Sequence, residues 1–102
     1  MARDQASVTC ALGAWTELTN SDATAITFQV LSGSVKVRAT TGSAPSALTD
    51  PGYVYHAHTG TPQNENGELA IAISSLAAAA GVDRVFATPI GGRRAVVIVD
   101  HA

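Results

Sequence analysis

The segment from residue 24 to residue 40 constrains the fold of this chain more than any other. Its hydrophobic side chains occupy alternate positions on both sides of a Ser-Gly-Ser turn, at Ile26, Phe28, Val30, Val35, Val37 and Ala39. A period of two is typical of strands with one buried face. Lys36 and Arg38 fall on the opposite face of the second strand. The pattern predicts a β-hairpin with one solvent-exposed face.

Most of the remaining chain has the composition of short strands separated by turn residues. The expected strands cover residues 8–12, 15–18, 53–58, 68–73, 83–88 and 93–100. Gly91-Gly92 suits a second hairpin between the last two, and the apolar run 95–99 predicts a strand covered on both faces. Residues 74–81, with serine at the start and glycine at the end, predict one short helix late in the chain.

These segments predict an all-β protein: a small single-domain β-sandwich or barrel of about seven short antiparallel strands. We expect residues 1–7 to be a flexible N-terminal arm and residues 8–102 to form the single β domain. A domain of this size buries only about two-thirds of the surface of its unfolded chain. Its hydrophobic content of 46% includes only 5% aromatic residues. The expected core is therefore light, and association with identical copies would stabilise it.

Charge and composition argue against several classes of protein. Six Lys and Arg residues against eight acidic ones leave a net charge of −2, so we expect no nucleic-acid partner. No apolar run approaches the roughly 20 residues of a membrane span, and the N-terminus has no signal-peptide pattern, so we expect a soluble protein made in the cytoplasm. Cys10 is the only cysteine; it cannot form an intrachain disulfide, and we interpret it as a small core residue.

The sequence predicts no catalytic site and no cofactor. His56 and His58 would share one face of the strand over residues 53–58, so they are the candidate metal ligands. A metal site needs at least three protein ligands, however, and no third one stands at a suitable spacing. A Ser-His-Asp set could be assembled on paper from Ser74 or Ser75 and Asp83, but the Gly-x-Ser-x-Gly motif is missing. We therefore expect a protein that is not an enzyme.

The aromatic residues allow two interpretations. Trp15, Tyr53 and Tyr55 could form a stacking platform for sugars. Because the chain has few large side chains, we favour the second interpretation, in which they pack in the core or at an interface with another subunit. We take all three as candidate contacts with a partner.

Six segments of the sequence together resemble those of a known class of protein. They are residues 15–19 (Trp-Thr-Glu-Leu-Thr), 25–29, 32–37, Pro45, 84–87 (Arg-Val-Phe-Ala) and 96–102. The chain resembles the small all-β virion proteins of tailed bacteriophages, in particular head decoration (cement) proteins. Each of these segments is an expected strand or turn, and none is a catalytic or ligand-binding motif.

The resemblance implies a structural protein that binds the outer surface of the phage head and stabilises it. It implies the major capsid protein as partner, a homotrimer at three-fold positions, and a location on the virion after synthesis in the host cytoplasm. In such proteins an N-terminal arm can join the capsid lattice, which makes Arg3 and Asp4 further contact candidates. The alternative is a glycan-binding or tail- or fibre-associated β module of a phage virion.

Overall fold

The computed structural model describes residues 6–22, 25–42, 44–45, 47–49, 51–61, 71–72 and 82–101. These residues form nine strands and no helix. The strands are β1 (Ala6–Cys10), β2 (Thr16–Glu17), β3 (Ala25–Ser32), β4 (Ser34–Thr40), β5 (Tyr53–His56), β6 (Gly60–Thr61), β7 (Ile71–Ala72), β8 (Arg84–Pro89) and β9 (Ala95–His101). The all-β class is confirmed. The number exceeds the expected seven. β2 and β7 lie within expected strands, whereas β6, with two residues, is not among them because it is too short to show an alternating pattern.

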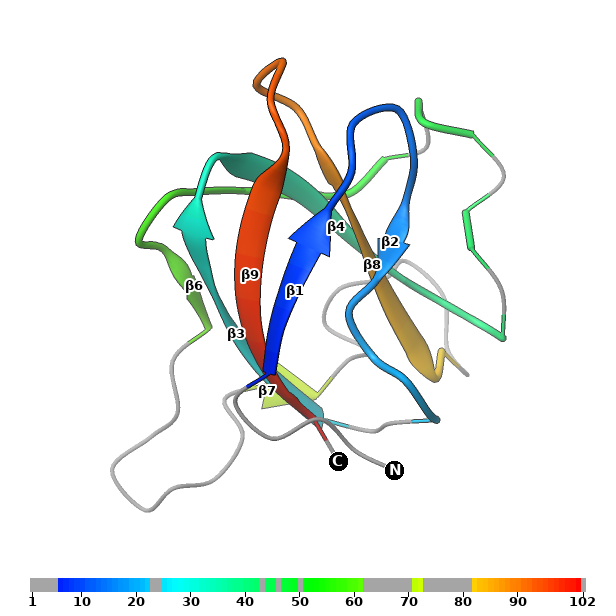
Figure 1. Cartoon of the computed structure of the whole chain (residues 1–102). Coiled ribbons are helices and arrows are strands. Elements are labelled where there is room, and N and C mark those ends of the chain that lie inside the picture. Colours follow the sequence, from blue (N-terminus) through cyan, green and yellow to red (C-terminus); the bar gives the residue numbers. More distant parts are fainter. Residues whose placement is uncertain are drawn as a thin grey trace.

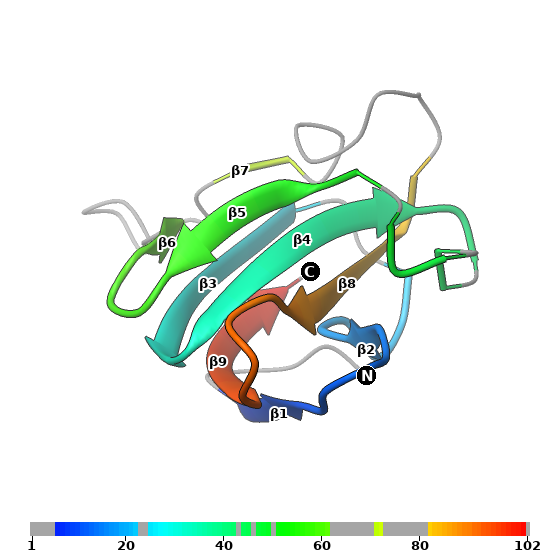
Figure 2. The ribbon, with the colours of Figure 1, turned by 90° about the horizontal axis from the view of Figure 1, so that it is seen from above.

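The strands form two antiparallel sheets (Figure 1). The five-stranded sheet has the order β1-β9-β3-β6, and β7 also pairs with β3. The four-stranded sheet has the order β2-β8-β4-β5. Seen from above, β4 and β8 lie on one side of the body and β1 and β9 on the other (Figure 2). The two sheets therefore form two layers.

Hydrophobic side chains from both sheets meet in one core between the layers. Its members are Val8, Cys10, Leu18, Ile26, Phe28, Val30, Val35, Val37, Ala39, Val85, Ala87, Ala95, Val97 and Val99. All six positions of the alternating pattern in residues 26–39 belong to it, so the predicted inward faces are confirmed. Phe28 is the largest of the fully buried side chains, in agreement with the expectation of a core built from small residues.

The predicted hairpin between residues 24 and 40 is wrong. β3 pairs with β9, β6 and β7, whereas β4 pairs with β5 and β8, so the two strands lie in different sheets. Gly33 joins them with φ of +77°, and a Cβ atom there would lie 3.0 Å from the Cβ of Ala95. The chain thus crosses from one layer to the other through a glycine packed against β9. Alternation defines the buried face of a strand, but it does not identify the neighbouring strand.

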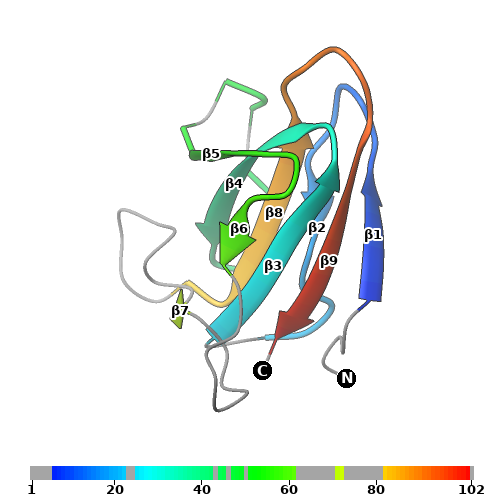
Figure 3. The ribbon, with the colours of Figure 1, turned by 90° about the vertical axis from the view of Figure 1, so that its left-hand side faces the viewer.

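The predicted hairpin around Gly91-Gly92 is wrong for the same reason, because β8 and β9 also lie in different sheets. The β1–β2 connection makes a third crossing. Other connections also cross between the sheets, but these three lie at the same end of the body (Figure 3). We call this end, consisting of residues 11–14, 31–34 and 90–94 with the adjoining His56–His58, the turn end.

Several boundaries differ from the sequence-based expectation. β1 begins at Ala6, which pairs with Val99, so the first strand takes the last two residues of the expected arm. β9 is buried on its inner face, but Val96 and Ile98 on its outer face are half-buried, so the strand is not fully covered on both sides. Of the strand expected over residues 68–73, only Ile71–Ala72 is described. The expected helix over residues 74–81 lies outside the described residues.

Candidate functional site

The two histidines proposed as metal ligands do not share a strand. β5 ends at His56, and His58 lies in the following turn with φ of +69°. His56 instead contacts Ser34, whose Oγ lies 3.0 Å from its Nδ1, while the backbone N–H of His58 donates to the carbonyl of Val30 at 2.6 Å. Within the described part of the chain, no three His, Cys, Asp or Glu side chains gather as metal ligands would.

Trp15 holds a loop on the outer face of the four-stranded sheet. Its indole Nε1–H donates to the carbonyl of Ala47 at 2.9 Å, and the Nζ of Lys36 lies 5.3 Å from its ring centroid. Lys36 also donates to the carbonyl of Leu48 at 2.6 Å, and Arg38 donates to that of Pro51 at 2.9 Å. The outward positions of Lys36 and Arg38 match the predicted alternation, and both cations stabilise the loop that leads into β5.

The two tyrosines lie on β5, an edge strand of the four-stranded sheet. Tyr55 is half-buried and packs against the core, with its ring 4.8 Å from that of Phe28. Burial and, secondarily, the neighbouring Tyr53 raise the pKa of its hydroxyl. Tyr53 is 56% exposed. Because Tyr55 points into the core and Trp15 lies over the outer face, the three aromatic residues do not form one platform.

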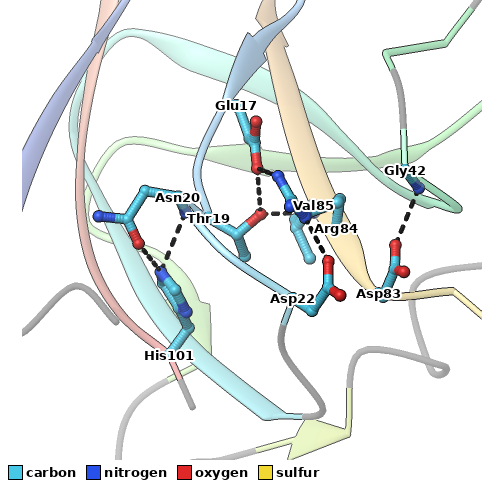
Figure 4. A network of polar contacts seen from close by, with 9 residues as sticks. All are labelled: Glu17, Thr19, Asn20, Asp22, Gly42, Asp83, Arg84, Val85 and His101. Atoms are coloured by element: carbon cyan, nitrogen blue, oxygen red, sulfur yellow. Dashed lines mark hydrogen bonds and ion pairs between the residues drawn. The ribbon is translucent and has the colours of Figure 1, made fainter. Parts of the chain in front are cut away.

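A polar network joins β2 to β8 (Figure 4). The guanidinium of Arg84 donates to Glu17 Oε2 and to Asp22 Oδ1, each at 2.9 Å. Hydrogen bonds to Asp22 and Glu17 raise the pKa of this arginine. Thr19, which is 1% exposed, donates through Oγ1 to Glu17 at 2.9 Å and accepts from the backbone N–H of Val85 at 3.2 Å. The network fixes the edge strand β2 in place.

Two further polar contacts in Figure 4 attach neighbouring segments to the same region. The backbone N–H of Asn20 donates to Nε2 of His101, at the end of β9, at 3.2 Å. The carboxylate of Asp83 accepts from the backbone N–H of Gly42 at 2.8 Å. Like the network around Arg84, these contacts hold chain segments together.

Sequence reasoning missed this network. Arg84 is separated from Asp22 by 62 residues and from Glu17 by 67, and no local pattern connects residues so far apart. The sequence Thr19-Asn20-Ser21-Asp22 indicates a turn, since such side chains hydrogen-bond to their own backbone, but it does not indicate a distant partner. The alternation of charged and apolar residues around Lys36 did predict correctly that its side chain lies on the outer face of the sheet.

Cys10 is fully buried at the end of β1. Burial raises the pKa of its thiol to about 11. A thiol in this state is not a nucleophile at neutral pH, since the thiolate is the reactive form. The structure agrees with the interpretation of Cys10 as a small core residue.

An open depression lies at the turn end. It has a volume of about 390 Å³ and is lined by Gly33, Ser34, His56, Ala57, Gly91 and Arg93. Arg93 and the neighbouring Arg94 are exposed, as is His56. Its polar side chains are the guanidinium of Arg93, the hydroxyl of Ser34 and the ring of His56, each of which can donate a hydrogen bond, while its glycines leave the backbone accessible. This chemistry suits the binding of a carboxylate or another anion.

Among the residues that the structure describes, the exposed large hydrophobic side chains belong to the turn end, to β5 and to the loop before β5. They are Leu12, Leu31, Leu48, Tyr53, Val54 and Ile90. Leu12, Leu31 and Ile90 belong to the three crossings of the turn end. Arg3 and Asp4, the contact candidates in the N-terminal arm, lie outside the described residues.

No family model, curated protein or solved structure matches this chain. Among the described residues, no helix has the length and apolarity that a bilayer crossing requires. The residues of the chain itself must therefore support any functional proposal.

Proposed function

We propose that this protein is a structural virion protein, a decoration or cement protein that binds the outer surface of a phage head and stabilises it. The observation that supports the proposal is a contrast between two kinds of side chain: three of the described cations make contacts within the fold, whereas large hydrophobic side chains remain exposed. Lys36, Arg38 and Arg84 all hold chain segments together. Among the described residues, six large hydrophobic side chains remain exposed, and three of them, Leu12, Leu31 and Ile90, belong to the turn end. Exposed apolar side chains that lie together mark sites of contact with another protein.

In this proposal the two sheets form a small β-sandwich that presents its loops and edges to the capsid. The partner is the major capsid protein, and the chain acts as a homotrimer at three-fold positions. One subunit contacts more than one capsid protein, so its interfaces must be broken before the capsid proteins separate. A standard interface buries about 800 Å² per partner, and many copies on a shell add their effects.

The test is reconstitution on heads assembled without this chain. We expect saturable binding of the purified protein to these heads and a higher temperature of DNA release once they are coated. Light scattering of the protein alone should give three times the 10.4 kDa mass of the chain if the trimer forms in solution. Uncoated and coated heads that release DNA at the same temperature would contradict the stabilising role.

One observation favours the alternative, a glycan-binding or tail-associated module. Tyr53 is 56% exposed on an edge strand, and an exposed ring is a stacking surface for a sugar. A glycan array with the wild-type protein and the Tyr53→Ala variant tests this candidate. Binding that is present in the wild type and lost in the variant would favour it over capsid decoration.

A further inference from the structure

Charge is distributed unequally between the two ends of the described body. The turn end carries the exposed side chains of Arg93 and Arg94, together with His56 and His58. The acidic residues that the structure describes lie away from it: Glu17 and Asp22 with Arg84, Asp83 just before β8, and Asp100 opposite Thr27. Although the chain has a net charge of −2, the described residues make the turn end locally cationic.

Apolar and cationic groups occur together at this end. Leu12, Leu31 and Ile90 are 54%, 39% and 45% exposed. The topology brings them to one end, because Cys10 pairs with Ala95 and Ser32 pairs with Val96 on opposite sides of β9. The backbone N–H of Ile90 donates to the carbonyl of Ser34 at 3.1 Å, which ties the β8–β9 crossing to the start of β4.

From this juxtaposition we propose that the turn end is the docking surface for an acidic protein surface, and that the depression beside Arg93 receives a carboxylate from it. Charge complementarity selects an acidic partner and steers its approach. The three exposed apolar side chains select a protein over a nucleic acid, since phosphate backbones offer them no apolar counterpart. The depression adds the hydroxyl of Ser34 and the ring of His56 to the guanidinium of Arg93.

The identity of the partner as the capsid rests on the proposed function; the location and chemistry of the surface do not. A first experiment therefore needs no capsid. The isolated protein is titrated with an acetylated peptide of alternating Glu and Leu, and amide shifts are followed by NMR. We expect shifts confined to the turn end, weakened by salt because exposed charge pairs are screened. Shifts elsewhere only, no shifts at all, or tighter binding of a DNA duplex than of the peptide would overturn the proposal.

The second experiment compares variants in the binding of heads that lack this chain. Arg93→Ser with Arg94→Ser, and separately Ile90→Ser, should each weaken binding roughly tenfold, as the loss of one good contact does. Arg93→Lys with Arg94→Lys keeps the charge and should retain most of the binding. Val54→Ser is the control for the loss of an exposed apolar side chain, since Val54 is 50% exposed and is not one of the turn-end residues.

The outcomes separate the two proposals. If the wild type does not bind heads but the peptide binds the turn end, the capsid partner is wrong and the docking surface stands. If the wild type binds heads and the turn-end variants bind equally well, the protein is a capsid binder and the docking surface is wrong. Thermal unfolding of each variant shows whether a loss of binding reflects a loss of fold.

Discussion

The rings of Phe28 and Tyr55 meet edge to face across the two sheets, with centroids 4.8 Å apart and planes at 85°. Phe28 belongs to β3 of the five-stranded sheet and Tyr55 to β5 of the four-stranded sheet. The contact therefore bridges the layers at the side where β5 is an edge strand. The ring contact attaches the edge strand β5 to the core of a protein that has few large side chains.

We expect a measurable coupling between these two rings. Phe28→Leu and Tyr55→Leu should each destabilise the protein, and the double variant should lose less than the sum of the two. The difference should be about 0.5–1.5 kcal/mol, the usual range for an aromatic pair. Urea unfolding of the four proteins in the cycle measures it. Tyr53→Leu is the control, because this exposed neighbour should change stability by about 0.5 kcal/mol or less.

Gly33 is expected to resist substitution more than other glycines with positive φ. Gly33→Ala places a side chain at φ of +77° and brings its Cβ within 3.0 Å of the Ala95 Cβ. The backbone conformation alone costs about 1–2 kcal/mol, and overpacking adds about 1–3 kcal/mol. Gly13→Ala is the matched control, since Gly13 has φ of +75° with nothing within 4 Å of a Cβ. Equal losses of unfolding free energy in the two variants would show that the contact with β9 is unimportant.

The hydroxyl of Thr19 should contribute more to the stability of the protein than the volume of its side chain does. Thr19→Val keeps the volume but leaves the backbone N–H of Val85 without the acceptor that lies 3.2 Å away. An unsatisfied buried donor costs about 1–3 kcal/mol. Amide hydrogen exchange at Val85 should accelerate in this variant and stay slow in Thr19→Ser, which retains the oxygen. Slow exchange in both variants would mean that the hydrogen bond contributes little.

The buried thiol of Cys10 predicts a loss of stability in alkaline solution. Its pKa is raised from 9.0 to about 11 in the folded protein, so the folded state keeps a proton that the unfolded state releases. This contribution is fully present below pH 9 and is lost as the pH rises toward about 11. Unfolding free energies of the wild type and of Cys10→Ala, measured across that window, should differ in slope, with the steeper decline in the wild type. Parallel curves would count against burial of the thiol.

Part of the chain could be predicted from local patterns. The inward faces of β3 and β4 followed from alternation, as did the outward positions of Lys36 and Arg38. The all-β class followed from repeated short segments between turn residues. The strand over His56 was predicted too long, because His58 adopts a positive φ that its sequence context does not signal.

Other features depended on contacts between distant residues. The ion pairs of Arg84 connect it to residues more than 60 positions away, and the indole of Trp15 meets the carbonyl of Ala47 from a separation of 32. The turn end itself exists only because three crossings between layers meet there. No window of the sequence contains enough of these partners to predict the surface that they form.

By itself, the sequence determined which sides of β3 and β4 are buried, because side chains alternate with the geometry of the strand they belong to. Only the tertiary structure decided which strands pair. The backbone N–H and C=O groups that join strands are the same at every residue, so they do not identify a partner. Packing of the two inner faces against each other made that choice, and it converted the expected hairpins into crossings between sheets.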